Sequence, residues 1–123
     1  MTRSAAAIAI LALLMPAAGR AADTAAGQTA FGKCKICHSV EAGARSPVGP
    51  NLHGVFGRKA GSLEGFSYSA AMKNSGVVWD DDSMAKYLHD PRGSMPGNKM
   101  AFPGIKNEEE MTNLLAYLHQ ATQ

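Results

Sequence analysis

The chain has 123 residues, a length that favours a single small domain. Its formal net charge is +2, but Arg3 and Arg20 lie in the N-terminal segment, and without them ten basic residues balance ten acidic ones. This balance argues against a general nucleic-acid-binding protein, and it means that any electrostatic attraction of a partner depends on where the charges lie.

The first predicted element is a secretory signal peptide over residues 1–21. Arg3 supplies the positively charged start, residues 5–15 form an apolar stretch, and small residues before and at Ala21 suit a cleavage site after that position. The apolar stretch is too short to span a bilayer, so we expect no stable membrane insertion. The sequence therefore predicts export to the periplasm and a mature domain over residues 22–123.

Four short helices are predicted in this domain, over residues 24–36, 69–74, 81–89 and 108–121. The last has the clearest pattern, since its apolar residues share one face. Residues typical of helix starts and stops flank the four segments: Asp23 or Thr24, Asp80 and Asn107 as N-caps, Glu110 at a capping-box position, and Gly76 and Pro91 as breakers.

Long loops rich in glycine and proline connect these helices. The clearest are residues 47–54 and 96–104, and no stretch shows the alternation of a convincing strand. The expected fold class is therefore all-α, with about four short helices and unusually long loops. Loops of this length usually have a reason, and a large apolar cofactor around which they wrap would supply one.

The only two cysteines lie in the segment Cys34-Lys35-Ile36-Cys37-His38. A disulfide across so small a loop would add little stability, and a redox-active dithiol expects a βαβ unit that the sequence lacks. A zinc site usually takes four ligands from two separated pairs. The spacing Cys-x-x-Cys-His is instead typical of covalent haem attachment. Two thiols on one helical turn can each bond a vinyl group of one porphyrin edge, and the next imidazole can bind the iron.

The residues alone leave the second axial ligand open. An open position on the iron suits gas binding or peroxide chemistry, whereas two protein ligands suit electron transfer. Met84 and Met111 follow helical periodicity and are expected in the core, and Met72 is similar. Met95 and Met100 lie in the second glycine- and proline-rich loop, and both remain candidates. The other histidines are weaker ones.

Six sequence blocks occur in a set order: CKICH at residues 34–38, VGPNLHGVFGRK at 48–59, GFSY at 65–68, VVW at 77–79, PGNKM at 96–100 and LLAYL at 114–118. In this order they resemble the class I cytochromes c, specifically short bacterial relatives of mitochondrial cytochrome c. The resemblance covers nearly the whole mature domain. It implies the small cytochrome c fold wrapped round one haem c, attached covalently through Cys34 and Cys37. It also implies that His38 and Met100 are the axial ligands of the iron.

The resemblance implies further roles around the haem. The Pro50 carbonyl would accept a hydrogen bond from the His38 ring, and Tyr87 would reach the Met100 sulfur. Gly27 would let the first helix approach the last. A haem propionate would be bound by Tyr68 and Trp79, with Arg58 offsetting its charge.

The sequence also departs from the family pattern. Asn98 stands where many relatives have a hydroxyl residue, and Met72 replaces an amide often found near an internal water. Ser94 and Met95 replace an aromatic–aliphatic pair. These departures predict that the surroundings of the iron ligands are retuned.

The implied function is one-electron transfer by a soluble periplasmic carrier, so we expect no enzymatic activity and no catalytic residue. The carrier would shuttle electrons between a cytochrome bc-type complex or a dehydrogenase and a terminal oxidase, a reaction centre or a peroxidase. We expect a monomer that binds no nucleic acid. The alternative is a haem sensor or peroxidase-like enzyme with a displaceable Met100. Docking would use four basic residues near the motif or the ligand loop: Lys33, Lys35, Arg92 and Lys99.

Overall fold

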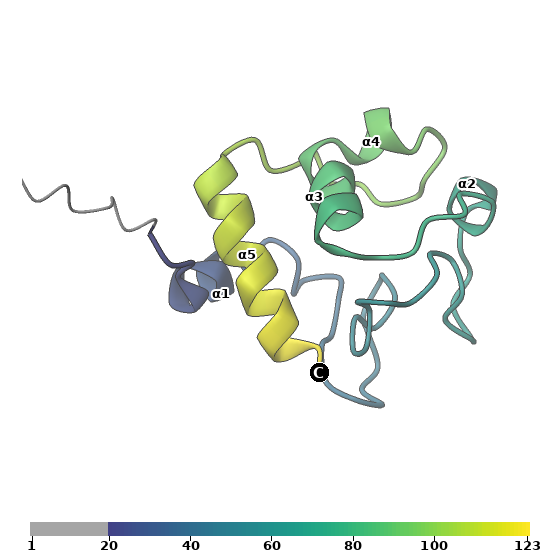
Figure 1. The fold of residues 1–123 in the computed structure, drawn as a ribbon. Coiled ribbons are helices and arrows are strands. Elements are labelled where there is room, and N and C mark those ends of the chain that lie inside the picture. Colours follow the sequence, from purple (N-terminus) through teal and green to yellow (C-terminus); the bar gives the residue numbers. More distant parts are fainter. Residues whose placement is uncertain (1–19) are drawn as a thin grey trace, which may run out of the picture.

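The computed structural model describes residues 20–123, which form five helices joined by long loops (Figure 1). Within this part of the chain no strand forms, and a single isolated bridge joins Lys59 to Val78. The expected all-α class is therefore confirmed. The helices are α1 Thr24–Phe31, α2 Ala70–Lys73, α3 Asp81–His89, α4 Pro91–Ser94 and α5 Glu108–Ala121.

None of the helices in residues 20–123 is long and apolar enough to cross a membrane. The signal peptide expected over residues 1–21 lies outside the described residues, apart from its last two positions. The signal peptide and the domain boundary at residue 22 therefore stay predictions.

The first and last helices, α1 and α5, cross on one side of the molecule (Figure 1). At the crossing Gly27 faces the α5 backbone: a Cβ atom placed on it would lie 2.0 Å from the Asn113 carbonyl oxygen and 2.8 Å from Tyr117 Cβ. The Asn113 side chain accepts a hydrogen bond of 2.8 Å from the Asp23 N–H, just before α1. The rings of Phe31 and Tyr117 lie 5.4 Å apart. The close approach of these two helices at Gly27 is therefore confirmed.

Two of the expected helices, α3 and α5, begin and end where the sequence predicts, because their N-caps are in place. The Asp80 carboxylate accepts the Ser83 N–H at 2.8 Å and Ser83 Oγ accepts the Asp80 N–H at 2.9 Å. These bonds form a complete capping box and lower the pKa of Asp80. Asn107 caps α5 through the Glu110 N–H, at 2.8 Å. The Glu110 carboxylate pairs with Lys33 instead of closing the box, so the capping box expected at α5 is only half formed.

Two features differ from the sequence expectation. α1 ends at Phe31 and not near residue 36, because Gly32 follows it and the chain then enters tight turns. α4 is an additional helix. Pro91 does end α3, but a proline also fits the first position of a helix, and the Asp90 side chain caps the new helix by accepting the Gly93 N–H at 2.9 Å.

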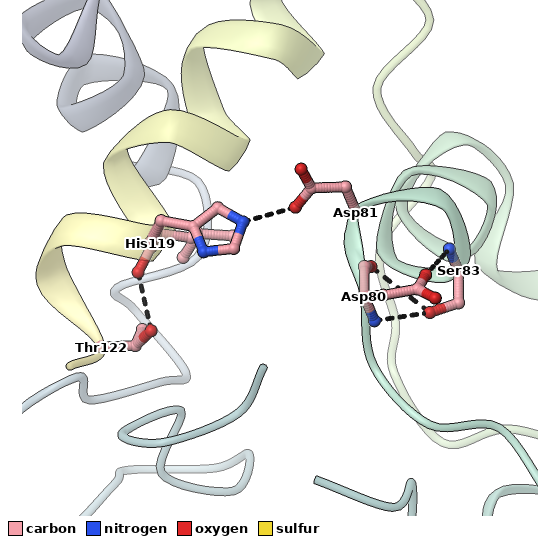
Figure 2. Close-up of polar contacts among 6 residues, drawn as sticks. Asp80, Asp81, Ser83, His119 and Thr122 are labelled. Atoms are coloured by element: carbon pink, nitrogen blue, oxygen red, sulfur yellow. Dashed lines mark hydrogen bonds and ion pairs between the residues drawn. The ribbon is translucent and has the colours of Figure 1, made fainter. Parts of the chain in front are cut away.

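A second set of contacts joins α5 to α3 (Figure 2) and to the loop near residue 55. His119 on α5 pairs with Asp81 at the start of α3. The His119 ring also stacks on Phe56, with ring centres 3.8 Å apart and planes inclined by 14°. Just beyond α5, the Thr122 carbonyl accepts the Gly54 N–H at 2.6 Å. The long loop that follows the cysteine motif is thereby fixed to the C-terminal end of α5.

We expect Gly27→Ala to destabilise the protein with its cofactor bound, because the added methyl group would collide with the α5 backbone. Alanine gains about 1 kcal/mol over glycine inside a helix, but overpacking of this kind costs about 1–3 kcal/mol or more. Chemical denaturation measures the resulting free energy of unfolding. Gln28→Ala, at the exposed position next along α1, is the matched control. Equal stabilities for the two variants would contradict the contact at Gly27.

Candidate functional site

Cys34, Cys37 and His38 follow α1 closely and lie in helix-like turns. The N–H groups of Cys37 and His38 both donate to the Cys34 carbonyl, at 3.0 and 2.9 Å. The Cys37 carbonyl accepts the N–H groups of Val48 and Gly49, at 3.2 and 2.8 Å. All three side chains of the motif are half-buried. The fold therefore brings two thiols and an imidazole together on one turn, with the backbone of the next loop across from them.

The His38 imidazole is fixed from two sides. Its Nδ1 lies 2.7 Å from the Pro50 carbonyl oxygen, so Nδ1 must carry the ring proton, and Nε2 keeps its lone pair. A Cβ atom on Gly49 would lie 2.4 Å from His38 Cε1, so the glycine backbone lies directly against the ring. Burial lowers the pKa of His38, although the Pro50 bond opposes this effect. The imidazole is therefore neutral at pH 7, which is the form that binds metals.

The two thiols do not have the properties of a redox pair. Cys34 and Cys37 are free, and burial raises the pKa of Cys34 to about 11. Reactive dithiols have lowered pKa values, so this environment disfavours that class. It disfavours a zinc site as well, because residues 20–123 bring together no group of three or more His, Cys, Asp or Glu side chains that could hold a metal ion.

The structure distinguishes the five methionines of residues 20–123 by their environments. Met84, Met95 and Met111 are core residues, with exposed fractions of 6%, 7% and 8%. Met72 is half-buried on the short helix α2. Met100 is half-buried in the loop between α4 and α5. The residue pattern left both Met95 and Met100 as candidate ligands. Because Met95 packs in the hydrophobic core, Met100 is the better placed of the two.

Asn98 fixes the backbone next to Met100. Its Oδ1 accepts the Met100 N–H at 2.8 Å and the Tyr87 hydroxyl at 3.3 Å. Its Nδ2 donates to the Pro91 and Met95 carbonyls, at 2.8 and 2.9 Å. The expectation that Tyr87 reaches the Met100 sulfur is corrected here: the phenol donates to the amide oxygen, which is a much stronger acceptor than a thioether.

The residues expected at a haem propionate differ in what they contact. Arg58 uses its guanidinium to donate to the carbonyls of Asn51 and His53, both at 3.1 Å. Its observed role is therefore to fold the loop after the motif. Trp79 is buried, with 7% of its surface exposed, and Tyr68 is half-buried. Their contact with a propionate stays a prediction.

Two residues that position the site, Gly49 and Asn98, were given no structural role in the sequence analysis. Gly49 precedes Pro50 in the block that folds over the motif, and a glycine at such a place is a weak signal of close packing. Asn98 is visible in the sequence only as a departure from the family pattern. Its partners Tyr87 and Pro91 lie eleven and seven positions away, so no local pattern indicates them.

Together these side chains fit a covalently attached porphyrin. The chain provides two half-buried thiols one turn apart, a neutral imidazole with its proton fixed away from Nε2, and a thioether on a separate loop. Thiols, imidazole and thioether are the groups that attach haem c and bind its iron.

Comparison with known proteins assigns the chain to a family. Residues 24–122 match the family model for cytochrome c. The chain is 45% identical to cytochrome c2 of Blastochloris viridis, over 90% of this chain and 86% of that protein. It is 50% identical to cytochrome c-550 of Bradyrhizobium diazoefficiens, over 78% of this chain and 71% of that protein. It is also 50% identical to cytochrome c2 of Rhodoblastus acidophilus, over 81% and 94%. The chain therefore belongs to the cytochrome c family, and its cofactor is one covalent haem c.

We expect Gly49→Ala to push the His38 ring away from Pro50, because the new Cβ would lie within 2.8 Å of three ring atoms. Weakening the bond to Pro50 should speed exchange of the Nδ1 proton by roughly fivefold or more, the equivalent of a hydrogen bond worth about 1 kcal/mol. NMR of this proton in the haem-loaded protein measures the rate. Val48→Ala, at the exposed neighbouring position, should leave it unchanged. Equal rates in both variants would show that Gly49 does not position the ring.

Proposed function

We propose that this protein is a soluble periplasmic one-electron carrier. Cys34 and Cys37 form the two thioether bonds to its haem c, and His38 Nε2 and the Met100 sulfur bind the iron. The observation that carries the proposal is the distribution of the methionines: the core uses Met95, and Met100 is left in the loop. The neutral His38 ring, with its proton at Nδ1, is the matching ligand on the motif.

Haem c, when bound, supplies a reversible one-electron couple between Fe(III) and Fe(II). The chain sets the conditions for that couple. Pro50 holds the His38 proton at Nδ1 and raises the basicity of Nε2. Met100 contributes a neutral, polarisable sulfur, which favours the reduced metal. Met100 also packs against the buried hydrophobic core, which limits the rearrangement that accompanies a change of charge.

Two side-chain ligands leave no open coordination position, so we propose electron transfer and not enzymatic catalysis. The alternative, a haem sensor or peroxidase-like enzyme, requires a Met100 that leaves the iron easily. The hydrogen bonds between Asn98 and the Met100 and Tyr87 groups oppose such opening. They favour the carrier.

We propose redox proteins as partners: a cytochrome bc-type complex or a dehydrogenase as donor, and a terminal oxidase, a reaction centre or a peroxidase as acceptor. Ile36 and Val48, beside the two cysteines, are 71% and 69% exposed, so the docking surface has an apolar centre. Lys35 lies exposed within the motif. Lys33 is also among the basic residues that the sequence predicts for docking, but it forms an ion pair with Glu110.

Two further cations lie at the ligand loop. Arg92 and Lys99 line a surface hollow of about 680 Å³ together with Met100 and Phe102. Asp90 lines the same hollow. We propose the exposed cations Lys35, Arg92 and Lys99 as the positive part of the docking surface. The predicted signal peptide supports the periplasm as the location, and we propose that the carrier acts as a monomer.

We expect Met100→Ala to abolish the near-infrared methionine–iron band of the oxidised protein and to lower its midpoint potential. A fall of roughly 0.1 V or more fits the spread of about 0.8 V that axial ligands produce among haem proteins. Spectroscopy combined with redox titration measures both quantities. Met95→Leu is the matched control, because it replaces the core methionine with a residue of similar volume. If the band persists in Met100→Ala and disappears in Met95→Leu, the assignment of the ligand is wrong.

We expect electron transfer to an acidic redox partner to slow as ionic strength rises, because salt screens the attraction to the three cations. Lys35→Gln should reduce the bimolecular rate constant at low salt and flatten its salt dependence. Lys73→Gln removes a charge of the same type at the end of α2, outside the proposed docking surface, so its effect should be smaller. Stopped-flow kinetics at several salt concentrations test both variants. A rate constant that is independent of salt would show that docking is apolar.

A further inference from the structure

The Asn98 side chain uses every hydrogen-bonding position that an amide has. A primary amide has two N–H donors and an oxygen with two lone pairs. Both donors are used, on the Pro91 and Met95 carbonyls, and both lone pairs are used, by the Met100 N–H and the Tyr87 hydroxyl. A half-buried side chain with four partners is restricted to one orientation.

The partners also determine which end of the amide is which. The Met100 N–H can only donate, so it requires the oxygen. The Pro91 and Met95 carbonyls can only accept, so they require the nitrogen. Burial raises the pKa of Tyr87 to about 12, so its hydroxyl keeps its proton and remains a donor. A reversed amide would place like groups opposite one another at three of the four contacts.

Three of the four partners are buried parts of the scaffold. Pro91 at the start of α4 is among the most deeply buried side chains of residues 20–123, and Met95 and Tyr87 are each 7% exposed. The fourth partner is the backbone of Met100 itself. Asn98 therefore connects the ligand to α3 and α4, which are fixed by the core.

Few other hydrogen bonds hold this stretch of the described chain. The Asn98 N–H donates to Met95 at 3.1 Å, and the Phe102 N–H donates to the Met100 carbonyl at 3.0 Å. The next backbone hydrogen bond to the scaffold is donated by the Ile105 N–H to the Leu88 carbonyl, at 2.9 Å. Among residues 20–123, the Asn98 bond is the one side-chain contact that fixes the Met100 N–H. This amide thus fixes the backbone from which the thioether projects, while the side chain itself packs against the hydrophobic core.

We infer that Asn98 is a positioning residue that keeps the Met100 sulfur on the iron and so excludes small external ligands from that position. The inference rests on the proposed ligation by His38 and Met100. An external ligand can bind only when Met100 is detached, so its apparent dissociation constant rises as the detached fraction falls. The hydrogen bonds of Asn98 form only while the Met100 loop is packed on the scaffold, so they lower the fraction of molecules in which Met100 is detached. The four hydrogen bonds of Asn98, which we call the Asn98 clamp, therefore determine how readily an external ligand can replace Met100 on the iron.

The test is an imidazole titration of the oxidised, haem-loaded protein at pH 7, followed through the near-infrared methionine–iron band. We expect the unaltered protein to show the band and to bind imidazole weakly. Asn98→Ala removes all four side-chain bonds and should lower the apparent dissociation constant about tenfold or more. Tyr87→Phe removes only the 3.3 Å contact and should change it about twofold. Asn98→Ser, which cannot reach the Pro91 carbonyl, should lie between these two and serves if the alanine variant does not fold.

Asn107→Ala is the control for a merely structural effect. It removes the N-cap of α5, which lies away from the clamp, so it should lower the free energy of unfolding without changing imidazole affinity. Imidazole affinities of the Asn98 variants that match the unaltered protein, or that change no more than in Asn107→Ala, would overturn the inference. Absence of the band from the unaltered protein would instead overturn the ligation by Met100, so the two failures are distinguishable.

Discussion

The contact between α1 and α5 at Gly27 is the constraint on which the rest of the structure depends. A side chain at this position would meet the Asn113 carbonyl at 2.0 Å, so only glycine allows the two helices to lie this close. The cysteine motif begins three residues after α1, so the crossing of α1 and α5 determines where the motif lies. The ion pair between Lys33 and Glu110 adds a second link between the motif and α5. A scaffold made from the two ends of the domain thus positions the attachment site, while the long loops supply the remaining contacts.

The two sides of the haem site are fixed in different ways. On the His38 side, backbone groups hold the motif and the imidazole ring. They are the Pro50 carbonyl, the Gly49 backbone and the N–H groups that donate to the Cys37 carbonyl. On the Met100 side, one amide side chain ties the loop to α3 and α4. The backbone hydrogen bonds tolerate most substitutions, with Gly49 as the exception because a side chain there would meet the His38 ring. The side-chain contact of Asn98 is lost with a single change. The methionine side is accordingly where a single side-chain substitution can act at little cost to the rest of the fold.

The sequence predicts this structure well wherever the determining interactions are local. The bounds of α3 and α5 follow from Asp80 and Asn107, whose side chains bond to amides three residues away. The proposed iron ligands rest on the cysteine motif and on the family resemblance, since the residue pattern alone left both Met95 and Met100 as candidates. The pattern fails where a partner is distant: Glu110 pairs with Lys33, and Tyr87 donates to Asn98 and not to sulfur. α4 is a different case, because Pro91 both ends one helix and begins the next.

The crossing of α1 and α5 has a consequence for the order in which the protein matures. Gly27 belongs to the first helix of the domain, and its partners Asn113 and Tyr117 belong to the last. If the chain is exported with its N-terminal end first, as the predicted signal peptide implies, it cannot complete this interface until nearly all of it has crossed the membrane. Throughout that interval Cys34 and Cys37 precede a scaffold that does not yet exist, and they remain open to enzymes that attach haem. This topology therefore leaves an interval for haem attachment before the interface closes, because α5, which fixes the motif in place, is the last helix of the chain.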